Sequence, residues 1–192
     1  MQILFYDKYY DTEDYESNMN RFKNELNQQF KEFDDNIKTY DANIGHGADS
    51  PSIIIDIFNN FGSKEVIVAS LVSLFFLGDK INKNVNAWLE IINKISTLIQ
   101  KNKPARIDAE TAMLLAFKFV LDKKYNIEDI SLSTQVIPFN KGSVSSDNIL
   151  ETTPDSLYIF SIKVKNKIFI IGIKSKGNIE FTHEYSSEWY EF

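Results

Sequence analysis

The residues with the clearest chemical potential lie in one short turn, at positions 45–50, which reads Gly-His-Gly-Ala-Asp-Ser. Two glycines permit a tight turn, and a serine followed by Pro51 is typical of the start of a helix, whose free amide groups can bind an anion. The candidate ligand-binding residues are therefore Gly45, His46, Gly47 and Ser50. The turn lacks the lysine of a phosphate-binding loop, and its serine stands where a dinucleotide fingerprint needs glycine. A plain structural turn is the simpler interpretation.

The same turn holds the residue types of a nucleophilic triad, His46, Asp49 and Ser50. Residues so close in sequence rarely adopt the hydrogen-bonded arrangement of a catalytic triad. The chain also has no G-x-S-x-G motif, the nucleophile elbow that would expose the serine. A chain with two histidines and no cysteine is not expected to bind zinc. We therefore predict no catalytic residue, no metal and no cofactor. An enzyme of unrecognised type at residues 45–51 stays as an alternative hypothesis.

An α+β fold is expected to position this turn. Residues 2–6 are predicted to form a strand, residues 12–33 a surface helix, and residues 36–43 a second strand, which together make a split or simple βαβ unit. The helix carries one apolar stripe at steps of three and four, formed by Tyr15, Met19, Phe22, Leu26, Phe30 and Phe33.

A cluster of apolar helices is expected next. The uncharged residues 66–77, VIVASLVSLFFL, are apolar on every side of a helix, so we predict that they form a central helix enclosed by the rest of the chain. At about a dozen residues the segment is too short to cross a bilayer, which takes about 20. Around it we expect helices over residues 53–61, over residues 79–103 before Pro104, and after a cap at Asp108.

The C-terminal part is predicted to be an antiparallel β-meander. Strands are expected at residues 130–139, 157–164, 168–174 and 179–185, the last carrying His183. A polar loop at residues 140–154 marks an internal boundary. The chain is thus predicted to have an α/β-helical core domain, residues 1–128, and a β-meander lobe, residues 129–192, packed on the first. Three aromatic residues in the tail are candidates for docking or partner binding, namely Trp189, Tyr190 and Phe192.

Charge and composition narrow the class of partner. The net charge of −6 comes entirely from residues 1–50, which hold 11 acidic and 5 basic side chains. Because lysine and arginine are not clustered, direct nucleic-acid binding is disfavoured. Another protein is the expected partner, a basic one being a candidate for the acidic N-terminal part, and homo-oligomerisation is left open. The absence of cysteine and of a secretory signal favours a cytoplasmic location, and no stable membrane span is expected.

The order of the first elements, with Gly45-His46-Gly47-Ala48 leading into three isoleucines, resembles the effector-associated constant component modules of bacterial conflict systems. The resemblance covers residues 1 to about 100 and implies a small, non-catalytic module that couples sensing to effectors through protein contacts. The leading hypothesis is a protein–protein interaction module, such as a coupling or immunity-type component of a defence or toxin system. A membrane-acting effector that uses an apolar helical hairpin at residues 53–77 is the alternative from another class.

Overall fold

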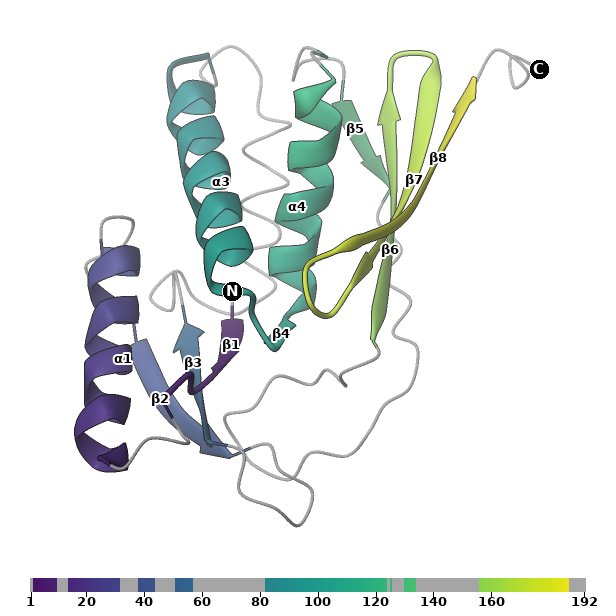
Figure 1. Cartoon of the computed structure of the whole chain (residues 1–192). Helices are drawn as coiled ribbons and strands as arrows, with labels where there is room; N and C mark the ends of the chain where they lie inside the picture. The colour runs from purple at the N-terminus through teal and green to yellow at the C-terminus, as the bar shows by residue number, and fades with distance from the viewer. Residues whose placement is uncertain are drawn as a thin grey trace.

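The computed structural model describes residues 2–9, 14–31, 38–43, 51–56, 82–123, 125, 130–133 and 156–186. Within these residues the chain forms three helices and two four-stranded antiparallel sheets (Figure 1). The predicted α+β class, with an N-terminal strand followed by a helix and with a C-terminal antiparallel meander, is confirmed. The predicted central helix at residues 66–77 lies outside the described residues.

The N-terminal sheet has the strand order β2-β3-β1-β4. Its strands are β1 (Gln2–Tyr6), β2 (Lys38–Asn43), β3 (Pro51–Asp56) and β4 (Arg106–Ile107). Because β3 runs antiparallel to both β1 and β2 and lies between them, β1 and β2 point the same way. The strand–helix–strand unit is therefore the split form of βαβ, one of the two forms that the sequence allowed.

The helix predicted at residues 53–61 is wrong for its described part, since residues 51–56 form strand β3. Ile53 and Ile55 belong to the main core, whereas Ile54 packs with Leu4 on the opposite face of the sheet. A strand buried on both faces carries a continuous apolar run, and a run this short cannot be told from a buried helix by periodicity. Pro51 is the first residue of the strand, where its missing N–H group is tolerated.

Helix α1 (Tyr15–Lys31) covers the core-facing side of this sheet. Phe22, Leu26 and Phe30, three members of the predicted stripe, are buried, and the ring of Phe30 lies 6.1 Å from that of Phe5 in β1. The predicted amphipathic helix is thus confirmed. Its polar side is tied to the helix that ends at Asn102, because the side-chain amide of Asn102 donates a hydrogen bond of 3.1 Å to Gln29.

Helices α3 (Asn82–Asn102) and α4 (Ala109–Asp122) run side by side, with α4 between α3 and the C-terminal sheet (Figure 1). The predicted cap is confirmed, since the side chain of Asp108 accepts a hydrogen bond of 2.9 Å from the backbone N–H of Thr111. Nearly every turn of α4 is buried, because α3, β1 and the C-terminal sheet all pack against it. Its buried residues are Thr111, Ala112, Met113, Leu114, Leu115, Ala116, Phe117 and Val120.

The C-terminal sheet has the order β5-β6-β7-β8, so neighbours in sequence are neighbours in space. Its strands are β5 (Ile130–Ser133), β6 (Leu157–Val164), β7 (Lys167–Lys174) and β8 (Ile179–Ser186). In β6 the burial alternates residue by residue, which is the pattern of a strand with one face on the core. The predicted meander is confirmed, and its last strand forms one edge of the sheet (Figure 1).

Strand β4 joins the two sheets. It pairs with β1 in the N-terminal sheet, while the N–H of Ile107 donates to the carbonyl of Ser175 just after β7, at 2.6 Å. The buried hydroxyl of Tyr158 in β6 donates to the carbonyl of Ile107 at 2.9 Å. One core cluster accordingly contains residues of α1, α3, α4 and both sheets. The predicted domain boundary between residues 128 and 129 stays a prediction. The core cluster contains residues from both sides of that boundary.

Candidate functional site

The site residues predicted from the sequence belong to two segments, the turn at positions 45–50 and the C-terminal tail. The turn residues Gly45, His46, Gly47 and Ser50 and the tail residues Trp189, Tyr190 and Phe192 all lie outside the described part of the chain. The strands on either side of the turn are described, and Asn43, the last residue of β2, pairs with Pro51, the first residue of β3. The ligand-binding and partner-binding roles of these seven residues therefore stay predictions.

Strand β8 presents a row of aromatic side chains that the sequence analysis did not select. Phe181, His183 and Tyr185 alternate along the strand and pair with Gly172, Ile170 and Ile168 of β7. The ring centroids are 5.6 Å apart between Phe181 and His183, and 6.3 Å apart between His183 and Tyr185. We call these three residues the outer row, because they lie on the face of the sheet opposite the core.

The outer row is exposed to an unusual degree for aromatic side chains. Tyr185 is 53% exposed, His183 is exposed, and Phe181 is half-buried. The neighbouring outer-face residues Ile168 and Ile170 of β7 are only half-buried, whereas Phe169, Ile171 and Ile173 between and beside them are buried against the core. Aromatic and aliphatic groups gathered on one open sheet face are typical of a surface that meets another molecule.

A glycine shapes this surface. The ring of Phe181 lies over Gly172, and a Cβ atom at that position would be 2.7 Å from both Cδ1 and Cζ of the ring. Only a residue without a side chain lets the ring settle onto the backbone of the neighbouring strand. Gly172 therefore sets where Phe181 lies and, through it, where the outer row begins.

The acidic side chains of β8 form ion pairs with lysines of the same chain. Glu184 accepts hydrogen bonds from Lys167 at 2.6 Å and from Lys123, the residue just after α4, at 3.2 Å, and Glu180 pairs with Lys174 at 2.6 Å. The hydrogen bond from Lys167 is the main reason why the pKa of Glu184 lies below its ordinary value, and the same bond raises the pKa of Lys167. Unpaired charges at a sheet edge oppose pairing with another strand. In β8 the ion pairs with lysine weaken the repulsion that the glutamates would exert on an incoming strand.

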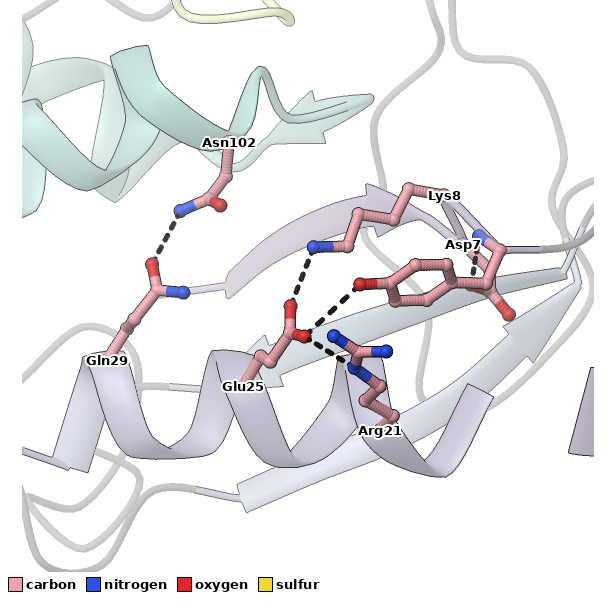
Figure 2. Close-up of polar contacts among 7 residues, drawn as sticks. Asp7, Lys8, Arg21, Glu25, Gln29 and Asn102 are labelled. Atoms are coloured by element: carbon pink, nitrogen blue, oxygen red, sulfur yellow. Dashed lines mark hydrogen bonds and ion pairs between the residues drawn. The ribbon is translucent and has the colours of Figure 1, made fainter. Parts of the chain in front are cut away.

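A second polar cluster surrounds Glu25 on α1, and Figure 2 shows how the side chains after β1 converge on it. Glu25 accepts hydrogen bonds from Lys8 at 2.6 Å, from Arg21 at 3.1 Å and from the hydroxyl of Tyr9 at 3.2 Å. The bond from Lys8 is the largest cause of the lowered pKa of Glu25. Since all these groups are engaged with one another, the cluster ties the chain after β1 onto α1.

A third cluster lies at the N-terminus of α4. Asp108 accepts hydrogen bonds from the backbone N–H of Gln2, and from both the N–H and the hydroxyl of Thr111. Burial, followed by the charge of Asp108 and a hydrogen bond to it, raises the pKa of Glu110 to about 7. A carboxyl group with such a pKa is a candidate proton donor in an active site. Here its partner is occupied in capping α4 and fastening β1, which is a structural role.

No group of three or more histidine, aspartate or glutamate side chains among the described residues is arranged to hold a metal ion. No helix in the same part of the chain is both long and apolar enough to cross a membrane. Comparison of the chain with models of known protein families, with curated proteins and with solved structures found no match.

Proposed function

We propose that the protein is a non-catalytic protein-interaction module that binds an extended segment of its partner as an added strand beside β8. The observation that carries the proposal is the exposed outer row of Phe181, His183 and Tyr185 on an edge strand. In strand addition, main-chain hydrogen bonds supply affinity and alternate side chains supply specificity. The partner segment is expected to carry apolar side chains at every second position, because these would continue the outer row.

The resemblance of residues 1–100 to effector-associated constant component modules supports a more specific role. On that basis the module would act in the cytoplasm of a bacterium and couple a sensor to an effector in a defence or toxin system. An effector or toxin gene next to the gene of this protein would support that context. Neighbouring genes without any such function would count against it, while the proposal of strand addition would stand.

Affinity capture from the native cell tests strand addition. We compare the wild-type chain with a double variant, Phe181→Ser with Tyr185→Ser, and with Tyr6→Ser as the matched control. Tyr6 is 49% exposed and lies on the N-terminal sheet, so its loss removes an exposed aromatic side chain away from β8. Far-UV circular dichroism and thermal unfolding verify that all three chains fold.

We expect the double variant to lose proteins that the wild type and the control both retain. Truncating two central aromatic side chains of an interface typically costs several kcal/mol, which corresponds to a loss of about 100-fold or more in affinity. Identical sets of captured proteins from the three chains would contradict binding at β8.

A further inference from the structure

The open side of β8 imposes requirements on the strand that binds there. Among the described strands, β8 pairs only with β7, and seven of its eight residues are exposed. It contains no proline, so every residue has a backbone N–H group. An incoming strand must be extended over about the same length and must present apolar groups at alternate positions on the outer face. Its charged groups must also avoid Glu180 and Glu184.

Strand β8 itself meets these requirements. It is a strand of eight residues with a register shift against β7 at Glu180, and beyond that shift its outer-face side chains at alternate positions are Phe181, His183 and Tyr185. Its two glutamates are held by lysines of their own chain. A second copy of β8 therefore has the required length, apolar side chains at alternate positions, and glutamates that are paired with lysines of their own chain.

We propose, resting on the strand addition proposed above, that the partner strand is β8 of a second copy, paired antiparallel about a two-fold axis at His183. The two-fold axis between the antiparallel strands is perpendicular to the sheet. The outer faces of the two copies therefore lie on the same side of the combined sheet. Residues directly opposite each other have side chains on the same face, so their sequence numbers must differ by an even number. This condition holds only when the two-fold axis passes through a residue rather than between two residues.

The glutamates select among these registers. An axis at Thr182 places Glu180 opposite Glu184 of the second copy, and an axis at Glu184 places that residue opposite itself. Like charges directly opposite each other destabilise a strand pair. An axis at Phe181 or Tyr185 avoids this but leaves a shorter overlap. The axis at His183 pairs residues 180–186 of both copies and sets Glu184 opposite Thr182.

In this register the two outer rows become one. Phe181 lies opposite Tyr185 of the second copy, and the two His183 rings meet at the axis. Aromatic pairs directly opposite each other on neighbouring strands stabilise the pairing relative to alanine pairs. The merged row continues across both copies of β7 through Ile168 and Ile170, so pairing produces one eight-stranded sheet with a continuous apolar outer face.

Cysteine substitution tests the register, because the natural chain has no cysteine. Under mild oxidation, His183→Cys places two thiols at the axis and is expected to give a disulfide-linked dimer. Thr182→Cys and Glu184→Cys are each expected to remain monomeric on a non-reducing gel and to cross-link when mixed. Tyr6→Cys, an exposed position on the other sheet, measures cross-linking by random collision.

We expect the dimer yield of His183→Cys to exceed that of Tyr6→Cys about tenfold or more, since pairing holds the two thiols at high effective concentration. Light scattering of the wild-type chain should give twice the mass of the monomer as its concentration rises. Equal cross-linking at the two positions, together with a monomeric mass at every concentration, would overturn the pairing of two copies. If the capture experiment above still depends on β8 in that case, strand addition stands with another protein as its partner.

Discussion

At the scale of single residues, Gly172 and Phe181 form the contact that shapes the proposed surface. We expect Gly172→Ala to lower the free energy of unfolding by about 1 kcal/mol, because the new methyl group displaces the Phe181 ring. The cost stays small because the ring is the half-exposed end of its side chain and can move. In a Phe181→Ala background the same substitution should be neutral or stabilising, since alanine restricts the unfolded chain.

A double-mutant cycle measured by chemical denaturation determines this coupling. Equal effects of Gly172→Ala in the two backgrounds would show that the ring and the glycine are independent.

Glu110 gives the protein a specific dependence on pH. Its pKa is raised from the ordinary value of 4.5 to about 7 by burial and by Asp108. Between these values the folded chain holds a proton that the unfolded chain has lost, so the contribution of Glu110 to stability falls as pH rises from about 4.5 to about 7. We expect Glu110→Gln to remove that decline and to be more stable than wild type at pH 8.

The expected gain at pH 8 is on the order of 1–2 kcal/mol, after allowance for the partial exposure of the side chain. Urea denaturation at a series of pH values measures it. Glu180→Gln, which alters an exposed carboxylate in a surface ion pair, serves as the control and should follow the wild-type curve. A wild-type advantage over Glu110→Gln at pH 8 would contradict the assigned pKa.

Residue patterns predicted the Asp108 cap but neither the raised pKa of Glu110 nor the role of Gly172. A cap is a local feature, read from an aspartate just before an apolar helix. The pKa depends on burial and on the nearby Asp108, which also accepts a hydrogen bond from Gln2, 106 positions away. The role of Gly172 depends on the register between β7 and β8. Long-range packing of this kind leaves no signal in a local pattern.

At the scale of elements, the sequence predicts the first strand and the long periodic segments correctly, but it assigns the short apolar run of β3 to a helix. Helix α1 and the meander have clear periods, 3.6 and 2 residues, because each has one solvated face. Strand β3 has no period, because Ile53, Ile54 and Ile55 are buried on alternate faces. The alternation of apolar and polar residues in β8 predicts a strand, and this prediction is confirmed. Its edge position, which makes the outer row accessible, follows only from the order of the strands.

The link between the sheets can be tested at the same scale with Tyr158. Its buried hydroxyl donates to the carbonyl of Ile107, so Tyr158→Phe leaves that carbonyl without this donor. We expect the free energy of unfolding to fall by about 1–2 kcal/mol. Chemical denaturation followed by circular dichroism measures the loss. Tyr185→Phe, which removes an exposed hydroxyl, should change stability by less than about 0.5 kcal/mol; equal losses would contradict the role of this bond.

At the scale of the whole molecule, the two sheets share one core, and among the described strands β8 lies at an edge of its sheet with most of its residues exposed (Figure 1). The helices pack on the inner faces of the sheets, and β4 links the two sheets by hydrogen bonds. The chain thus presents an edge strand that is already formed before binding, and preorganised surfaces lose little conformational entropy on binding. The account of the protein as an interaction module rests on this arrangement rather than on any group that performs chemistry.

Hydrogen exchange of the β8 backbone amides, compared between dilute and concentrated solutions of the wild-type chain, tests this account most directly. Pairing of β8 with a second copy should slow the exchange of alternate amides along residues 179–186 as concentration rises. The amides of α1 serve as the internal reference and should exchange at the same rate in both solutions. Exchange at β8 that does not change with concentration, with the chain monomeric throughout, would contradict self-association through this edge.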